Sequence, residues 1–285
     1  MGIALGYMAP GLLLLGLFLF YPAIRALWLS LSTTDLDGKI TGFVGVAQYR
    51  LLFTSPAFWT SLRATLLFAV IVVPSTLLVA MGLALLADRE LPAIGLFRTL
   101  FASPMAASVS AAALIFQLFY NPASGVLNDL LQHMGLGPVP WLTAPGWALF
   151  SVALISIWMN VGFTFLLLLG GLAQIPRELY EVADLDGISP WQRLTRITLP
   201  LWSPTLFFAL IVTMISSFQV FGQINILTRG GPIGATNVLV YDIYRNAFFN
   251  FQYTSASAEA MILFAIVIVL TLLQFRIGER RVFYR

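Results

Sequence analysis

The chain alternates between long apolar runs and shorter polar segments. A helix needs roughly 18 or more apolar residues to cross the hydrocarbon core of a bilayer. Nearly charge-free runs of that kind occupy residues 3–24, 64–87, 99–120, 147–173, 201–228 and 256–275. We therefore predict an all-α, polytopic membrane protein with six transmembrane helices. The sixth helix must carry Glu259 in its outer turn, and prolines inside two other runs, Pro74 and Pro104, are expected to mark kinks.

The segments between the apolar runs differ in composition and in charge. Residues 31–62, 121–146 and 229–255 are rich in Gly, Pro, Asn and aromatic residues, whereas 88–96 and 174–200 are the segments of the other side. That second side, together with the C-terminal tail, holds nine basic residues against six. The tail contributes Arg276, Arg280, Arg281 and Arg285. Because basic residues favour the cytoplasm, we predict that both termini are cytoplasmic.

Composition supports a lipid environment for most of the chain. Hydrophobic residues make up 59% of the sequence and charged residues 9%, where a soluble domain has roughly 25% charged residues. The net charge of +3 does not indicate a nucleic-acid partner, because the basic residues are scattered between apolar runs and form no stripe. No linker or shift in composition marks a second domain, so residues 1–285 are predicted to form a single membrane domain.

The residues that cofactor and nucleotide sites need are scarce. The chain has no Cys and a single His, His133, which excludes thiolate and paired-His metal motifs. Its only lysine, Lys39, lies in Gly38-Lys39-Ile40 and not in the Gly-Lys-Ser or Gly-Lys-Thr of a P-loop. We predict that the chain is not an enzyme, holds no cofactor and depends on another subunit for energy from ATP.

The polar segment 174–200 has clear helix signals. Pro176 and the acids after it favour a helix that runs to Asp186, Gly187 can take the left-handed turn that ends it, and Ser189-Pro190 suits the start of a second helix. This segment could lie on the membrane as an amphipathic surface helix or dock onto another protein. Its first helix is acidic and would be repelled by anionic lipid, which favours the protein partner.

The same segment carries a recognisable signature. Glu181-Val182-Ala183, then Gly187, then Ile197 and Leu199-Pro200 resemble the loop signature of ABC importer permeases. Asp186 is similar to the sugar-importer branch, and Val182 departs from the Ala that is usual in the family. Weaker similarities are spread over the chain, in residues 43–49, Asn121-Pro122 with Gly125 and Asn128, Trp141-Leu142, and residues 230–232.

The resemblance implies a type I ABC permease fold of the sugar or glycerol-3-phosphate type. In that family the loop is a coupling helix that sits in a cleft of the ATPase subunit. The implied partners are a second homologous permease, a pair of ATPase subunits that hold ATP and magnesium, and an extracytoplasmic substrate-binding protein. The implied location is the cytoplasmic membrane of a bacterium or archaeon.

Polar side chains inside the predicted spans are candidates for a substrate path. They are Trp158, Asn160, Ser216, Gln219, Gln223, Asn225 and Glu259. Amides and hydroxyls can bind sugar hydroxyls and aromatic rings can stack on sugar faces, but the same residue types also join packed membrane helices. Glu259 either lines the path or reaches water at the outer rim.

We predict a sugar or polyol as cargo, with glycerol-3-phosphate or a glycerophosphodiester as the alternative, although a phosphate calls for a cationic group that the spans lack. An ion-coupled secondary transporter would need more intramembrane charges and internal repeats. A hydrolase would need a positioned base or a metal.

Overall fold

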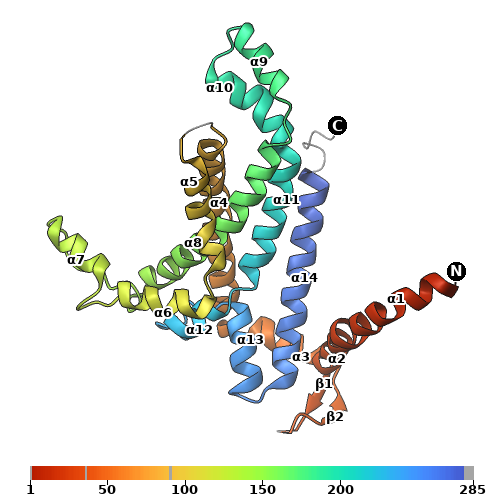
Figure 1. The fold of residues 1–285 in the computed structure, drawn as a ribbon. Coiled ribbons are helices and arrows are strands. Elements are labelled where there is room, and N and C mark those ends of the chain that lie inside the picture. The colour runs from red at the N-terminus through yellow and green to blue at the C-terminus, as the bar shows by residue number, and fades with distance from the viewer. Residues whose placement is uncertain (1, 36, 90–91, 279–285) are drawn as a thin grey trace. The chain divides into compact units, whose positions relative to one another are not determined.

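The structure is a computed structural model that describes residues 2–35, 37–89 and 92–278. Arg280, Arg281 and Arg285 of the predicted tail lie outside these residues. The chain divides into two compact units, Met1–Leu62 with Leu239–Ile266 and Arg63–Val238 with Val267–Arg285. Two long helices, α4 (Pro56–Ala87) and α14 (Tyr253–Gly278), both labelled in Figure 1, contribute residues to both units.

The first unit begins with a continuous helical stretch and a small hairpin. Its elements are α1 (Gly2–Leu15), the π-helical turn η1 (Gly16–Phe20), α2 (Tyr21–Ser30), β1 (Ser32–Thr34), β2 (Ile40–Phe43), α3 (Ala47–Thr54), α13 (Leu239–Phe248), residues 56–62 of α4 and residues 253–266 of α14. The antiparallel strands pair Ser32 with Phe43 and Thr33 with Gly42. Because α1, η1 and α2 follow one another without a gap, the helix predicted for residues 3–24 continues to Ser30.

A small core holds the first unit together. Leu52 of α3, Phe58 of α4, Leu239 of α13 and Ala258 of α14 form a buried cluster. Segments far apart in sequence thus meet around a shared apolar centre, and the structure places ordered helices in the stretches between the apolar runs.

The second unit contains most of the apolar helices. Its elements are the rest of α4, α5 (Ile94–Ala102), the 3₁₀ turn η2 (Ser103–Ala106), α6 (Val109–Phe119), α7 (Val126–His133), α8 (Pro145–Leu172), α9 (Arg177–Leu185), α10 (Pro190–Arg193), the π-helical turn η3 (Leu194–Thr198), α11 (Leu199–Phe218), α12 (Gly222–Leu227) and the end of α14. Proline opens α4, α8 and α10, where its missing N–H costs no helical hydrogen bond.

The core of the second unit lies where α4, α8 and α11 pack. Trp202 is fully buried, and its indole Nε1 donates a hydrogen bond to the carbonyl oxygen of Leu168 at 2.9 Å. The small residues Ala80 and Ala84 let α4 approach α8 closely, and Phe165 of α8 belongs to the same buried cluster. A Cβ on Gly171 of α8 would collide with the side chain of Thr205 on α11. The ends of α8 and α11 next to residues 174–200 are therefore in close contact.

Five of the described helical stretches are long and apolar enough to cross a membrane, and α5–η2 with α6 makes a sixth if the bent pair is one span. This agrees with six predicted spans, and Pro74 lies inside α4 without ending it. Two predicted spans, however, are not single helices. The run 99–120 breaks at residues 103–108 and bends by 99°, and the run 201–228 loses its helix at residues 219–221.

The physical causes of the two breaks differ. At the first, Pro104 cannot donate to a helical ladder, and Ser108 caps the new helix by accepting a hydrogen bond from the Ala111 N–H at 3.2 Å. At the second, the Ser217 hydroxyl donates to the Met214 carbonyl at 2.7 Å, a bond that competes with the helix. Gly222 then packs against α6, since a Cβ there would lie 2.5 Å from Cγ1 of Val109.

Candidate functional site: a docking loop and a polar cavity

The segment 174–200 folds into the predicted helix, glycine turn and second helix. Helix α9 ends at Leu185 with Asp186 as its C-cap, and Gly187 takes a φ of +66°. The Gly187 N–H donates to the Asp184 carbonyl at 3.2 Å and the Ile188 N–H donates to the Ala183 carbonyl at 3.0 Å. These two bonds form a Schellman motif, which explains why a glycine stands at this position.

The second helix has an equally clear start. The Ser189 hydroxyl accepts a hydrogen bond from the Gln192 N–H, and the Gln192 side chain accepts one from the Ser189 N–H, which together make a capping box. Helix α10 continues through η3 into α11. We call residues 174–200 the docking loop, after their predicted role. This loop is therefore joined without interruption to an apolar helix of the second unit.

Side chains lock the two halves of the loop to each other. Arg193 donates to Asp184 Oδ1 at 3.0 Å, and its guanidinium carbon lies 5.3 Å from the centre of the Tyr180 ring. The Tyr180 hydroxyl lies 3.2 Å from Oγ1 of Thr198. The exposed ion pair alone contributes only about 0–1 kcal/mol, so its main effect is to fix geometry together with the ring contact.

The signature residues divide into an exposed set and an anchoring set. Glu181, Asp186 and Gly187 are exposed, and Val182 keeps 55% of its surface in the open. Ala183 is buried, whereas Ile197, Leu199 and Pro200 are partly buried. The exposed face also includes two large apolar side chains that the signature does not contain, Leu185 and Trp191, at 88% and 72% exposure.

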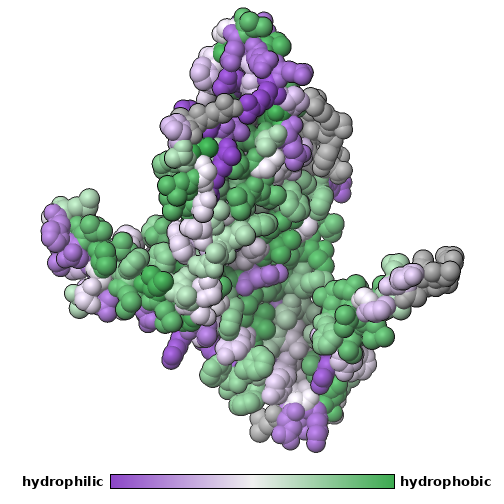
Figure 2. Space-filling model, in the orientation of Figure 1, coloured by the Kyte–Doolittle hydropathy of each residue, from purple (hydrophilic) through white to green (hydrophobic). Residues whose placement is uncertain are grey.

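The loop differs in surface character from the helices that carry it. Figure 2 shows hydrophilic residues gathered over α9 and α10, while hydrophobic residues cover the helices of the same unit next to them. Ile175, Leu179 and Tyr180 attach the loop to the core cluster that contains Trp202. The arrangement presents acids and isolated apolar side chains on a firmly held base.

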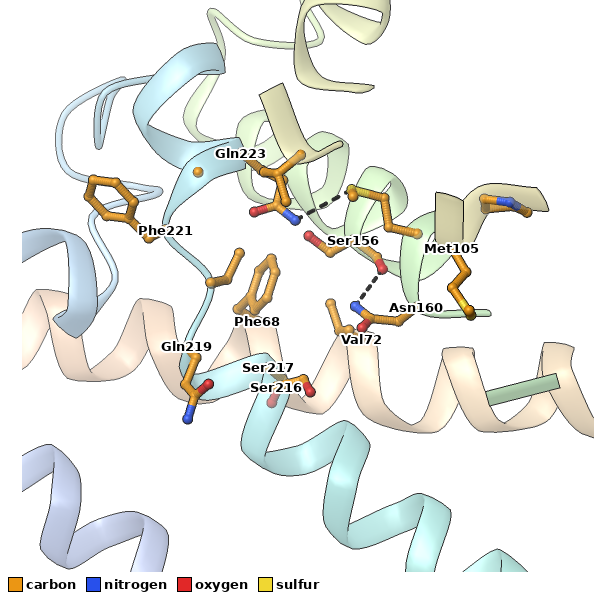
Figure 3. A pocket seen from close by; sticks show the side chains of 15 residues that line it. Phe68, Val72, Met105, Ser156, Asn160, Ser216, Ser217, Gln219, Phe221 and Gln223 are labelled. Carbon is orange, nitrogen blue, oxygen red and sulfur yellow. Dashed lines mark hydrogen bonds between the residues drawn. The ribbon is translucent and has the colours of Figure 1, made fainter. Parts of the chain in front are cut away.

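The second unit also contains a cavity of about 350 Å³ (Figure 3). Its walls come from α4, η2, α6, α8, the broken end of α11 and α12. Four of the predicted path residues line it, namely Asn160, Ser216, Gln219 and Gln223. Asn160 donates to the Ser156 carbonyl at 2.7 Å, and Gln223 Nε2 lies 3.7 Å from the Met159 sulfur. None of the described residues that line this cavity carries a charge.

The other three predicted path residues lie elsewhere. Trp158 does not line the cavity and packs on Phe116, with ring centroids 5.5 Å apart. Asn225, one turn into α12, is partly buried outside it. Glu259 belongs to the first unit and lines a different cavity there.

Sequence reasoning missed part of the cavity wall. Phe68 and Val72 of α4, Met105 of η2 and Phe221 of the break are lining residues without a polar signal that would single them out. Two sequence features could have indicated this wall, namely the pairs Ser103-Pro104 and Ser216-Ser217. Each pair weakens a helix beside the same cavity. Irregular backbone at membrane depth is tolerated where it lines a cavity or is buried in protein.

The weaker family motifs converge on one turn of the second unit. Asn128 makes four hydrogen bonds: its Nδ2 donates to the carbonyls of Pro122 and Val139, and its Oδ1 accepts from the Val139 N–H and the Trp141 indole. A Cβ on Gly125 would collide with the backbone of Asn121. The spacing of this motif therefore reflects a turn that closes on one asparagine.

The cavity of the first unit has a volume of about 480 Å³ and contains charged groups. Asp242 accepts hydrogen bonds from the Ser61 hydroxyl and from Arg245, both at 2.9 Å. Glu259 is 2% exposed, and its Oε1 accepts a hydrogen bond from Asn246 Nδ2 at 2.9 Å. Its Oε2 has no hydrogen-bond partner among the described residues.

Apolar helices broken around a polar cavity, together with a polar helix pair on a rigid base, define the class of multi-pass transport subunits. The family described as the binding-protein-dependent transport system inner membrane component matches residues 1–283. The chain belongs to this family and is a permease subunit of an ABC importer, not an enzyme.

Known proteins resemble it along its whole length. The sn-glycerol-3-phosphate transport system permease protein UgpA of Agrobacterium fabrum is 37% identical over 281 residues, which cover 97% of this chain and 94% of that protein. A probable ABC transporter permease protein of Pyrococcus horikoshii is 38% identical over 283 residues and covers 96% of each chain.

A crystal structure of a bacterial alginate ABC transporter, in complex with an alginate pentasaccharide-bound periplasmic protein, has a chain that matches with a TM-score of 0.82 and 25% identity. The match covers 98% of this chain and 94% of that one. The predicted family and type I permease fold are confirmed.

Proposed function

We propose that this permease carries a neutral sugar or related polyol. The observation that carries the proposal is the cavity of the second unit, where amides and hydroxyls line the breaks of two apolar helices without any charged group among the described lining residues. Gln219 and Gln223 can exchange hydrogen bonds with sugar hydroxyls, and Phe68 and Phe221 offer apolar surface. Weak, multiple contacts of this kind suit a site from which cargo must also leave.

We propose further that the docking loop couples this cavity to a separate ATPase. Helix α11 begins at Leu199 in the loop and ends beside the cavity at Phe218. At 1.5 Å per residue, Pro200 and Ser216 are separated by about 24 Å along one helix. A displacement of the loop therefore has a direct mechanical route to the cavity wall. Glu181, Val182, Asp186 and Gly187 form the exposed part that would meet the ATPase.

The remaining partners follow from the family. They are a second homologous permease, the ATPase pair that holds ATP and magnesium, and an extracytoplasmic binding protein. Within Tyr7–Ser30, the 18-residue window tested for apolar character has none of its residues buried within the chain, which leaves a face for lipid and for a second permease. We place the chain in the cytoplasmic membrane of a bacterium or archaeon, with both termini and the docking loop on the cytoplasmic side.

sn-Glycerol-3-phosphate is the second candidate substrate. The identity of 37% to a glycerol-3-phosphate permease favours it. Against it stands the absence of any cationic side chain among the described residues that line the cavity, because a phosphate group calls for Arg or Lys.

The test is uptake by the complete importer in proteoliposomes, with the binding protein supplied outside. We expect ATP-dependent uptake of a labelled neutral sugar or polyol, and a loss of about tenfold when Gln219 and Gln223 are both changed to Leu. Asp129→Asn, on the exposed surface of α7, is the matched control. Uptake of sn-glycerol-3-phosphate alone would replace the neutral cargo, and ion-driven uptake by this chain without an ATPase would overturn the proposal as a whole.

A further inference from the structure

The cavity of the first unit buries a carboxyl group that nothing in the permease's transport path explains. Three residues that line the cavity are ionisable, namely the acids Asp242 and Glu259 and the guanidinium of Arg245. Arg245 is already paired with Asp242 at 2.9 Å. Glu259 therefore has no cationic partner in the cavity, although it is 2% exposed.

The position of Glu259 is fixed by a relay of amides. Asn250 donates from Nδ2 to Asn246 Oδ1 at 2.9 Å, and Asn246 donates from its own Nδ2 to Glu259 Oε1 at 2.9 Å. This leaves Oε2 without a donor among the described residues. A buried carboxyl oxygen without a hydrogen-bond partner is costly. A ligand that donates a hydrogen bond to Oε2 would therefore gain binding free energy from that contact.

We propose that this cavity is a socket for a cationic side chain, Arg or Lys, of the extracytoplasmic binding protein. The proposal rests on the proposed function, because it assigns the socket to a partner of that importer. A hydroxyl of a sugar would supply only a hydrogen bond to Oε2, whereas an ammonium or guanidinium group would donate that bond and also stabilise the ionised form of Glu259, which burial disfavours.

The walls suit a long side chain better than an inorganic ion. The volume of about 480 Å³ is far larger than a bare cation needs, and the described residues contain no group of three or more His, Cys, Asp or Glu that could hold a metal ion. Gln48 and Gln252 offer further acceptors, and the exposed ring of Phe251 can cover an aliphatic stem. The lining comes from segments 31–62 and 229–255, which are predicted to face outward, and from Glu259 in the outer turn of the predicted sixth span.

The charge preference of the socket can be measured directly because the chain has no cysteine. Gln252 is exposed and lines the cavity, so Gln252→Cys places one thiol at its rim. In the complete importer, we expect a trimethylammonium-ethyl thiosulfonate to react there faster than a sulfonato-ethyl reagent. Adding Glu259→Gln, which keeps the shape of the side chain, should reduce that rate ratio about tenfold. Thr143→Cys, on an exposed turn of the second unit, serves as the control for intrinsic reagent reactivity.

The partner is tested by protection of the same thiol. The purified binding protein should slow labelling of Gln252→Cys, the protection should weaken as NaCl rises, and Glu259→Gln should require about ten times more binding protein for equal protection. An unchanged reagent ratio in Glu259→Gln overturns the socket. If Glu259→Gln fails to assemble, the NaCl series on the single Gln252→Cys variant decides, and salt-independent protection overturns the socket.

A binding protein that stimulates ATP hydrolysis but gives no protection overturns the assignment of the partner. A binding protein that does not stimulate ATP hydrolysis at all overturns the proposed function, and the reagent ratio then reports on the charge of the cavity independently.

Discussion

Replacing Gly187 with Val tests whether the geometry of the docking loop is what couples the permease to its ATPase. Gly187 has a φ of +66°, and a Cβ built on it meets no atom within 4 Å. The substitution therefore causes no steric collision with neighbouring segments. Its whole effect should come from the backbone, because a β-branched residue in the left-handed region costs about 1–2 kcal/mol or more.

The magnitude follows from the Schellman motif. If the turn loses its left-handed residue, the hydrogen bonds from the N–H groups of Gly187 and Ile188 to α9 are strained together. A cost of 1–2 kcal/mol corresponds to a factor of roughly 5–30 in the population of the native turn. We expect Gly187→Val to reduce both copurification with the ATPase and ATP-dependent uptake by about tenfold, with normal membrane insertion.

Two variants separate this explanation from general damage. Gly187→Asn should keep most of the coupling, because Asn adopts the left-handed conformation more readily than other residues with a Cβ. Gly137→Val adds the same side chain where a Cβ also meets nothing within 4 Å but no positive φ is required. Uptake and ATPase association that stay at the wild-type level in Gly187→Val would refute the docking role of the loop.

Three further predictions address the fold and the docking surface. Gly162→Ala should lower the melting temperature of the permease by the equivalent of about 1–3 kcal/mol, because its Cβ would lie 2.9 Å from the Ala102 carbonyl oxygen, whereas Gly170→Ala meets nothing and should be neutral in the same melting experiment. Asn128→Ala should destabilise the turn that it closes by about 1–3 kcal/mol, since two acceptors and two donors lose their hydrogen bonds to the buried Asn128 side chain, and increased proteolysis near residue 140 would report it. Trp191→Ala should weaken ATPase association by about tenfold without changing the melting temperature of the isolated permease, since its side chain is 72% exposed; unchanged association would remove Trp191 from the docking surface.

The sequence predicted best those features whose causes are local. Helix α9 starts and ends within a residue of its predicted limits, because Pro176, the early acids and Gly187 act on the backbone directly. The breaks at residues 103–108 and 219–221 depend instead on tertiary contacts, such as the approach of Gly222 to Val109. Apolar length alone cannot distinguish a continuous span from a broken one.

The same limit applies to the cavity. Four polar path residues gather there because their spans meet, but nothing in the sequence indicates that Trp158 packs on Phe116 or that Glu259 belongs to a different unit. The residues Phe68 and Val72 look like ordinary core positions until the facing helices are in place. Polarity in a span therefore identifies candidates, and only the packing decides which of them share a wall.

The way in which α8 and α11 pack determines where a push on the docking loop can be absorbed. Near the loop the two helices are fastened by the Trp202 hydrogen bond to Leu168 and by the close contact of Gly171 with Thr205. The pair should therefore move as one body. The nearest points where the backbone leaves the α-helical conformation are the breaks at residues 219–221 and 103–108. Residues of both breaks line the cavity. Because packed helices resist continuous deformation, the displacement concentrates at these breaks, which is where a small movement changes the size of the cavity most.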